Sequence, residues 1–335
     1  MDIAEIDVSD DAQLEAFWAT AKEADEFERP YAAYWSLEAA TAAMRADSRA
    51  FERRPFAAFD DGEVVGTGQV MLPRLDNTHI AFLVPMVKPS HRRRGIGTAL
   101  LEHGLEYARS RGRTTVIIEV NRPMTDSGPG VSAGHALLAK HGFTDASVDL
   151  HRVLELPVAG SRLDELEAET EEHRGEYRLV GYAESVPDAL IAGYCHLQEA
   201  FNAEAPLGDL DIEPEVWDEA RVREKEELFH RAGRRECGVV ALAPDGEMVA
   251  LTEMVMTDHQ PEVGWQGGTL VLKEHRGHRL GLAIKIANLR AYQEAFPLVR
   301  AVHSWNAEEN DSMVAINDKL GFRPVEYLVE MQRKL

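Results

Sequence analysis

A short basic segment with two glycines joins an apolar run to an amphipathic helix in the N-terminal half of the chain. The run Ile80–Val87 is expected to be a strand that ends at Pro89, and the segment Arg92–Gly97 follows it. Apolar residues then recur with helical spacing from Ile96 to Ala108, so a helix is expected directly after the turn. The first amides of a helix have no partner inside it, and glycine lets a ligand approach the backbone closely. The segment therefore predicts an anion site suited to a pyrophosphate.

This segment matches neither of two common phosphate-binding motifs. No Gly-Lys-Ser/Thr follows the glycines, as a Walker loop requires, and the three-glycine spacing of a dinucleotide fingerprint is missing. It resembles instead the Arg/Gln-x-x-Gly-x-Gly/Ala signature of the GNAT superfamily of acyl-CoA-dependent N-acetyltransferases, with Arg92, Gly95 and Gly97 at the matching positions. The alternative is a basic turn on a protein surface. The expected strand before it and helix after it favour the anion site.

Length and charge narrow the class of protein. A chain of 335 residues fits two domains better than one. The formal charge of −22 argues against a nucleic-acid partner, and it suits a cationic substrate such as an amine or simply an acidic solubilising surface. Cys195 and Cys237 are too few for a disulfide framework and lack metal-ligand spacing, so no metal site is expected. The acidic N-terminus and the absence of a long apolar run predict a cytoplasmic protein without a membrane partner.

The N-terminal half follows the element order β-α-α-β-β-β-α-β-α-β, which resembles that of GNAT domains. The expected strands are 3–8, 56–59, 64–71, 79–87, 114–120 and 148–156, and the expected helices include 31–46, the helix after the turn and 131–140. Gly142 and Phe143 after the last helix resemble another local feature of the family. Leu138 stands where many members carry a tyrosine that protonates the leaving thiolate, so the resemblance leaves the acid unassigned.

The same order of elements starts again after an acidic segment, Ser161–Arg174, which is expected to be a linking helix or a solvated connector. The C-terminal half repeats the turn as Arg276–Gly281 and the helix end as Gly321-Phe322. The chain thus resembles two tandem GNAT domains of the α+β class, each a mixed, mostly antiparallel sheet flanked by helices. The expected boundaries are 1–157 for the N-terminal domain, 158–175 for the linker helix and 176–335 for the C-terminal domain. A tandem layout is also known in mycothiol synthase, but no local feature ties this chain to that enzyme's substrate.

The resemblance implies acetyl-CoA (coenzyme A) as the cofactor. In each half, the end of the strand before the turn would hold the pantetheine and the thioester, and the turn would hold the pyrophosphate. In the N-terminal half these residues are Pro85, Met86, Val87, Arg92, Arg93, Arg94, Gly95, Ile96, Gly97 and Thr98. In the C-terminal half they are Thr269, Leu270, Val271, Arg276, Gly277, His278, Arg279, Leu280 and Gly281. Arg279 replaces the first glycine, and its side chain narrows the approach to the backbone.

Three asparagines add polar groups to the C-terminal half. Asn306 and Asn310 follow the penultimate strand, and Asn317 stands where the family tyrosine would be. The resemblance implies cofactor contacts from Asn306 and Asn310, and a catalytic contact from Asn317 to the leaving group. Asn310 is equally well placed to cap the next helix.

Acetyl transfer to an amine also needs a group that removes a proton. Glu119 and Glu253 are the carboxylates best placed by element order, each acting through a water, and the alternative for both is a strand-end acid in a polar cleft. Further candidates, with satisfied strand histidines as the alternative, are His79, His259 and His303. The residues where GNAT domains build their acceptor pocket, or where aromatics simply pack between helices, are Tyr31, Tyr34 and Trp35.

The expected function is that of an acetyl-CoA-dependent N-acetyltransferase, in which a small amine-containing substrate attacks the thioester directly. The rival is a non-catalytic acyl-CoA-binding or regulatory protein, favoured by the missing tyrosine at Leu138 and Asn317. The protein is expected to be a monomer or homodimer. The N-terminal half has the cleaner turn, so it is expected to bind acetyl-CoA more tightly. In the C-terminal half the Arg279 guanidinium is expected to contact a phosphate.

Overall fold

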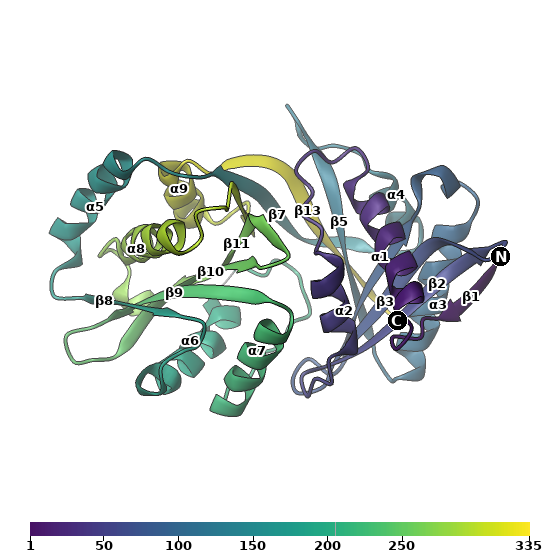
Figure 1. The fold of residues 1–335 in the computed structure, drawn as a ribbon, viewed down its shortest axis with the longest axis horizontal. Helices are drawn as coiled ribbons and strands as arrows, with labels where there is room; N and C mark the ends of the chain where they lie inside the picture. The colour runs from purple at the N-terminus through teal and green to yellow at the C-terminus, as the bar shows by residue number, and fades with distance from the viewer. Residues whose placement is uncertain (205) are drawn as a thin grey trace. The chain divides into compact units, whose positions relative to one another are not determined.

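The computed structural model describes residues 1–204 and 206–335, which form two compact units (Figure 1). Unit 1 consists of Met1–Asp149, Leu207–Glu213 and Glu326–Leu335, and unit 2 of Leu150–Pro206 and Pro214–Val325. The division into units does not follow the expected boundaries at 157 and 176. The first segment of unit 1 ends at Asp149, and two segments of the C-terminal half also belong to unit 1.

Unit 1 contains a mixed, mostly antiparallel sheet, as expected for the fold class. Its strands lie in the order β1-β2-β3-β4-β5-β13. The pairs β1–β2, β2–β3, β3–β4 and β5–β13 are antiparallel, and β4–β5 is parallel. The elements are β1 (Asp2–Glu5), α1 (Asp11–Glu26), α2 (Leu37–Arg45), β2 (Phe51–Asp60), β3 (Glu63–Pro73), β4 (Ile80–Val87), α3 (Ile96–Ser110), β5 (Thr115–Thr125), β6 (Gly128–Pro129), α4 (Ala133–Lys140), the start of β7 (Thr144–Glu155) and the end of β13 (Arg323–Lys334).

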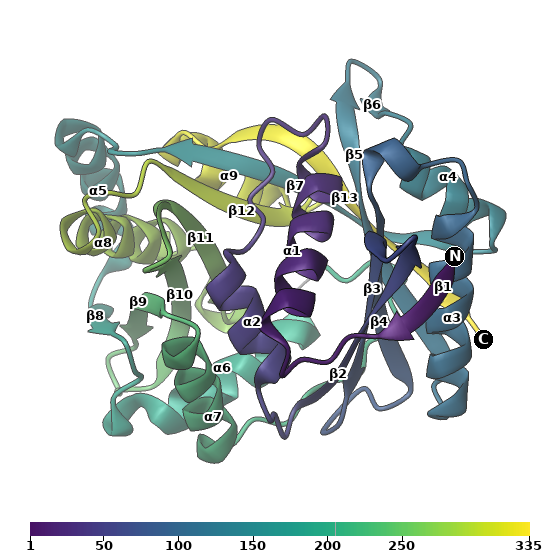
Figure 2. The same cartoon turned by 45° about the vertical axis from the view of Figure 1, so that its right-hand side comes forward.

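Helices cover both faces of this sheet, with α1 and α3 on opposite sides of β3 and β4 (Figure 2). The apolar stripe expected after the turn faces the core, since Ile96, Leu100 and Leu101 are buried together with Val116 and Ile118 of β5. A smaller apolar cluster holds α1 against the other face. Both helices therefore pack by the periodicity read from the sequence.

The last strand of the chain completes the sheet of unit 1. Glu326–Lys334 of β13 pairs antiparallel with β5, and Val329 and Met331 are buried in the same apolar cluster as Ile118. The segment Leu207–Glu213 also belongs to unit 1. Asn77, between β3 and β4, holds the end of this segment with two hydrogen bonds. Its Oδ1 accepts from the Glu213 amide at 2.7 Å and its Nδ2 donates to the Glu213 carbonyl at 3.2 Å.

Unit 2 repeats the arrangement, with strand order β7-β12-β11-β10-β9-β8. The pairs β8–β9, β9–β10 and β10–β11 are antiparallel, and β11–β12 is parallel. In Figure 1, α8 lies on one side of β9 and β10, and α6 and α7 lie on the other. Its elements are α5 (Gly160–Arg174), β8 (Arg178–Ala183), α6 (Ile191–Glu204), α7 (Glu219–Arg231), β9 (Arg234–Leu242), β10 (Met248–Thr257), β11 (Gln260–Val271), α8 (Leu280–Ala295), β12 (Ala301–Ala307) and α9 (Asp311–Leu320).

The acidic segment between the two halves forms helix α5. Leu163 and Leu166 of α5 are fully buried, and they share an apolar cluster with Leu282 and Ile286 of α8. The thin apolar stripe of α5 is thus packed, and its acidic face is turned to solvent. Within the described part of the chain, no helix combines the length and apolar character that a membrane span requires.

Candidate functional site

The basic turn of unit 1 has the backbone that an anion site needs. Arg93 and Gly95 both adopt left-handed conformations, with φ of 63° and 85°. The Ala99 amide is the first to bond within α3, to the Gly95 carbonyl at 3.0 Å, so the amides of Ile96, Gly97 and Thr98 have no partner inside the helix. These three N–H groups and the positive end of the helix dipole suit a phosphate.

The two glycines of this turn are needed for different reasons. A Cβ at Gly95 would meet nothing within 4 Å, so its left-handed φ is what favours glycine there. A Cβ at Gly97 would lie 3.1 Å from Leu137 of α4 and 3.6 Å from Val87, so the close approach of α4 is what favours glycine at that position.

The three arginines of the turn have different environments. Arg92 donates to the carbonyls of Val87 at 3.3 Å and Ala24 at 3.1 Å, so it ties the turn to β4 and α1. Arg94 forms an ion pair with Asp60 at 2.7 Å. Arg93 is exposed and has no hydrogen-bond or ion-pair partner in the part of the chain that the structure describes. Arg93 is therefore the guanidinium available to an incoming phosphate.

The turn of unit 2 has the same backbone with its glycine moved. Gly277 and Arg279 are left-handed, with φ of 89° and 54°, at the positions of Arg93 and Gly95. Arg276 Nε donates to the Val271 carbonyl at 3.2 Å, as Arg92 Nε does to Val87. The turn conformation is thus retained although a side chain replaces the first glycine.

The cations of the second turn are already paired with carboxylates. Arg279 Nη1 lies 3.2 Å from Glu169 Oε2 and donates to the Glu169 carbonyl at 3.1 Å. Lys319 of α9 pairs with the same Glu169 carboxylate, and Arg276 pairs with Glu204 at 2.6 Å. The Glu169 carboxylate of α5 is therefore paired with the Arg279 guanidinium, which was expected to contact a phosphate.

The strands that precede the two turns are open along one edge. In unit 1 the parallel register joins Ile80–Phe82 to Thr115–Ile117, whereas β4 continues to Val87 and β5 to Thr125. In unit 2 it joins Val263–Trp265 to Ala301–His303. Among the described strands, the only ladder partner is the antiparallel neighbour, β3 or β10, for the expected cofactor residues Pro85, Met86, Val87, Thr269, Leu270 and Val271. The carbonyls of Val87 and Val271 also accept from Arg92 and Arg276. The other edge of these strand ends offers backbone groups to a pantetheine chain.

Three carboxylates gather beside the opening in unit 1. Glu119 lies two residues beyond the last parallel pair of β5, directly opposite Glu330 of β13. Ile118 packs on the α3 side, so Glu119 points to the other face, and its pKa is raised by the surrounding protein and by Asp149. Burial raises the pKa of Glu330 to about 7 and that of Asp149 to about 6. Carboxyl groups with such pKa values exchange protons near neutral pH.

The sequence did not indicate Asp149 or Glu330. Glu330 comes beside Glu119 only because β13, from the far end of the chain, pairs with β5. No local pattern in either strand announces that pairing.

Glu253, the expected base of the C-terminal half, lies in a buried polar network. Its carboxylate accepts from Tyr182 at 2.9 Å and Tyr194 at 2.7 Å and pairs with Lys225 at 3.2 Å. Burial opposes ionisation, but Lys225 and the two hydroxyls together lower the pKa of Glu253. Burial and the neighbouring Glu253 raise the pKa of Glu236 to about 8. Glu253 is thus a fixed anion, and Glu236 is the carboxyl group that holds a proton.

Comparison with known proteins agrees with this geometry. The sequence profile of the acetyltransferase (GNAT) family matches residues 14–143. A tandem GNAT protein from the clavulanic acid biosynthesis pathway, solved without acetyl-CoA, is 27% identical over 99% of this chain and 98% of that one, with a TM-score of 0.78. The N-terminal half thus matches the GNAT family, and the chain has the fold and layout of a tandem GNAT protein. The family match and the tandem neighbour support acyl-CoA-dependent acetyl transfer and an acyltransferase activity in general.

Two less similar structures share the fold of this chain. A GCN5-related N-acetyltransferase from Sphaerobacter thermophilus is 15% identical over 99% of this chain and 95% of that one, with a TM-score of 0.65. A putative acetyltransferase from Pyrococcus horikoshii is 17% identical over 100% and 89%, with a TM-score of 0.55. No curated protein matches the sequence.

The three asparagines of the second GNAT unit separate into two roles. Asn317 and Asn306 are buried together, with Asn317 Nδ2 donating to Asn306 Oδ1 at 2.9 Å. Asn310 caps α9, since its Oδ1 accepts from the Met313 amide at 3.1 Å. Capping, the alternative considered for Asn310, is thus what the structure shows.

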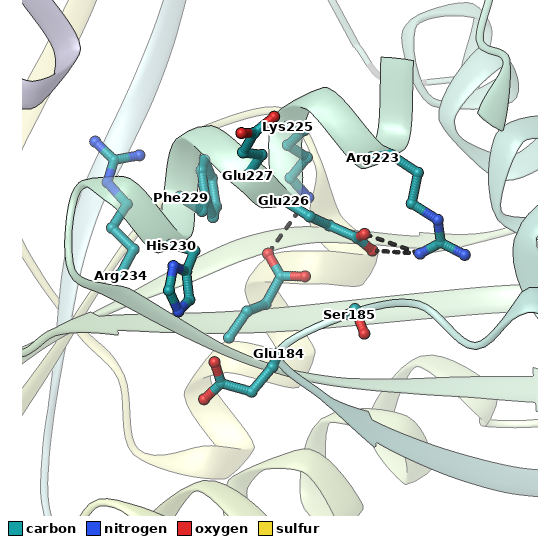
Figure 3. A pocket seen from close by; sticks show the side chains of 10 residues that line it. Glu184, Ser185, Arg223, Lys225, Glu226, Glu227, Phe229, His230 and Arg234 are labelled. Carbon is teal, nitrogen blue, oxygen red and sulfur yellow. Dashed lines mark hydrogen bonds and ion pairs between the residues drawn. The ribbon is translucent and has the colours of Figure 1, made fainter. Parts of the chain in front are cut away.

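A cavity of about 340 Å³ lies on the α7 side of the second GNAT sheet (Figure 3). Lys225 and Glu236 reach it from the buried network, and Arg223, Glu226, Phe229 and His230 of α7 form one wall. Figure 3 shows Arg223 directed at the Glu226 carboxylate, 2.8 Å away. The cavity has the size of a small-molecule site, but its charged groups are largely paired with one another.

The candidate histidines all have structural partners or turn positions. His79 Nε2 lies 3.0 Å from the Asp211 carbonyl, so it holds the segment Leu207–Glu213 in unit 1. His303 Nδ1 lies 2.8 Å from His151 Nε2 in unit 2, and Trp305 stacks on His151. His259 lies in the β10–β11 turn.

The helix expected over 31–46 is wrong at its N-terminal end. Helix α2 spans Leu37–Arg45, because the Ser36 hydroxyl accepts from the Ala39 amide at 3.2 Å and caps the helix there. Trp35, whose carbonyl accepts from Trp18 at 2.8 Å, therefore lies in the connection before α2, as do Tyr31 and Tyr34. Burial and Asp25 raise the pKa of Tyr34, so its phenol stays protonated.

Proposed function

We propose that this protein is an acetyl-CoA-dependent N-acetyltransferase that acts on a small amine-containing substrate, with the amine attacking the thioester directly. One observation supports this most: in unit 1, the opening between β4 and β5 has the anion turn at one side and Glu119 at the other. An acyl-CoA site and a proton-accepting carboxylate are the two things that the reaction needs in one place.

The residues of unit 1 supply defined parts of this reaction. The amides of Ile96, Gly97 and Thr98, with Arg93, would hold the pyrophosphate. The free edge of Pro85–Val87 would hold the pantetheine and orient the thioester, which acetyl-CoA supplies.

Glu119 is proposed to remove the proton from the substrate ammonium, directly or through a water. Desolvation by the surrounding protein, and then the neighbouring Asp149, keep its pKa above that of an ordinary glutamate, because both disfavour the charged form. A base with a raised pKa takes up a proton more readily near neutral pH. The carboxylate cluster also suits a cationic amine.

The second candidate is a non-catalytic acyl-CoA-binding or regulatory protein. Leu138 favours it, since this side chain is buried in the apolar core of unit 1 and cannot protonate a leaving thiolate. The paired cations of the second turn favour it too.

A panel of small amines with acetyl-CoA, followed by thiol release, tests the proposal. Turnover with at least one amine, reduced about 100-fold in Glu119→Gln, is the expected result. Glu106→Gln, on the exposed face of α3, is the matched control and should leave turnover unchanged. Calorimetric binding of acetyl-CoA without any thiol release would favour the regulatory protein instead.

A further inference from the structure

Three matched positions of the two units differ in polarity. The units can be aligned on the second glycine of the turn, on the glycine that ends the last helix, and on the parallel strand register. The side chains at these positions are Leu101, Leu138 and Val120 in unit 1, and Lys285, Asn317 and Asn306 in unit 2. The first three belong to one apolar cluster. Unit 2 therefore replaces an apolar set with an amine and two amides.

The polar set of unit 2 is buried and connected. The exposed fractions are 3% for Lys285, 0% for Asn317 and 8% for Asn306. Lys285 Nζ lies 5.2 Å from the centre of the Phe322 ring, and the Phe322 amide donates to the Asn317 carbonyl at 3.0 Å. Asn317 Nδ2 in turn donates to Asn306 Oδ1. The Lys285 amine thus lies over a ring that follows α9, and a hydrogen bond joins the side chains of the two asparagines.

Two polar groups of this set lack partners. Asn317 Oδ1 is buried without a hydrogen bond, and Lys285 has no hydrogen-bond or ion-pair partner among residues 1–204 and 206–335. Burial lowers the pKa of Lys285 to about 7. A buried acceptor without a hydrogen bond, and a buried amine whose contact is an aromatic ring, suit a ligand with complementary groups.

The set also lies beside the expected thioester path. Gly281 lies in the first turn of the helix that carries Lys285, and a Cβ on it would lie 3.0 Å from Ile316 and 3.7 Å from Val271. Asn317 is the next residue after Ile316, and Val271 is the end of the open strand. The polar set therefore continues from the strand end that would hold pantetheine into the core.

We propose that Lys285 is the proton donor to the departing thiolate in unit 2, with Asn306 and Asn317 holding the thiol end of coenzyme A. This inference rests on the proposed function. The nitrogen–carbon bond forms, the carbon–sulfur bond breaks with its electron pair on sulfur, and the proton moves from the Lys285 ammonium to that sulfur. The proton lost by the substrate nitrogen goes to solvent, from which the neutral lysine is reprotonated.

The test compares Lys285→Met with Leu101→Met, the same change at the matched position of unit 1. Methionine suits either core, so both variants should fold. Because the two units would release thiol independently, both changes are made in a Glu119→Gln background and assayed at pH 6, where the Lys285 ammonium predominates. There we expect Lys285→Met to lower the remaining thiol release about 100-fold while the KM for acetyl-CoA stays within twofold. Leu101→Met should leave the remaining rate unchanged.

A second readout does not depend on turnover. Calorimetry of coenzyme A binding in buffers of different ionisation enthalpy measures the protons exchanged on binding. We expect a proton exchange between pH 6 and 8 in the wild type that is lost in Lys285→Met and reduced in Asn317→Leu. An unchanged exchange in Lys285→Met overturns the inference, as does an unchanged rate in that variant. A wild-type protein that binds no acetyl-CoA and acetylates no amine would instead overturn the proposed function.

Discussion

The two anion turns share a backbone but differ in what their cations do. Both have left-handed residues at the same two positions, and in both the second glycine lies close to a side chain of the last helix of its unit, which favours a small residue there. In unit 1 the Arg93 guanidinium is free to meet a phosphate, whereas in unit 2 Arg279 is paired with Glu169. Backbone geometry is therefore maintained by local packing, while the availability of charge depends on a distant helix.

The regions beside the two turns differ in the opposite sense. Unit 1 has an apolar cluster where unit 2 has Lys285, Asn306 and Asn317. Unit 1 has three carboxylates at the opening, whereas Trp305 stands at the position of Glu119 in unit 2. Unit 1 thus has the groups that suit phosphate binding and proton removal, and unit 2 has the groups that suit a departing thiolate.

The largest effect is expected from cutting the chain between its two halves, because the last strand of the C-terminal half belongs to unit 1. The N-terminal fragment made by cleavage within Glu165–Arg174 lacks the strand that pairs with β5. The fragment loses the burial of Val329 and Met331 against its core, which should lower its free energy of unfolding by about 3–6 kcal/mol. We expect the isolated fragment to lose its cooperative thermal transition, as seen by circular dichroism, and to regain it with a peptide of residues 326–335. A fragment that melts as the intact protein does would show that unit 1 does not need the strand β13 for its stability.

A substitution at the first glycine should remove cofactor binding from unit 1 alone. Gly95→Val forces a β-branched residue into a left-handed conformation, at about 1–2 kcal/mol, and places a side chain over the free amides. We expect acetyl-CoA affinity at this site to fall at least tenfold by calorimetry. Gly62→Val is the control, because Gly62 has a φ of 83°, has equally open surroundings and lies in the β2–β3 turn. Equal affinity in both variants would remove the site from this turn.

The carboxylates of unit 1 should make stability depend on pH. The pKa of Glu330 is raised from 4.5 to about 7 in the folded protein, so its ionisation disfavours folding. Stability is then highest below the unfolded-state pKa and falls as the pH rises from about 4.5 to 7. In Glu330→Gln we expect a gain of about 1–2 kcal/mol at pH 8 and little change at pH 4, measured by urea unfolding. A gain of the same size at both pH values would contradict the raised pKa.

The smallest effect is expected at the second turn. Glu169→Gln should release Arg279 and Lys319 and strengthen coenzyme A binding in unit 2 by about threefold, a small effect because solvent screens exposed ion pairs. Glu172→Gln on the same helix, exposed in the structure, is the control. Weaker binding in Glu169→Gln would show that the carboxylate positions the turn and does not compete with a phosphate.

The sequence by itself determined the local parts of this protein. The strand–turn–helix around Gly95 and Gly97, its repetition at Gly281, and the apolar stripe of α3 follow from glycine conformation and helical periodicity. The Asn310 cap was also readable, as one of two roles for that residue. Each of these features depends on residues only a few positions apart, so a single sequence contains the information.

Only the tertiary structure decided which distant groups meet. Glu119 lies opposite Glu330 in the sheet, and Arg279 forms an ion pair with Glu169. No periodic pattern in the sequence spans these separations. Whether Lys285 is a surface lysine or a buried amine depends on what packs around α8, because the helix pattern alone allows either. The pKa of a carboxyl or amine follows from that packing through desolvation and neighbouring charge, so the chemistry of both units was determined by contacts that form only on folding.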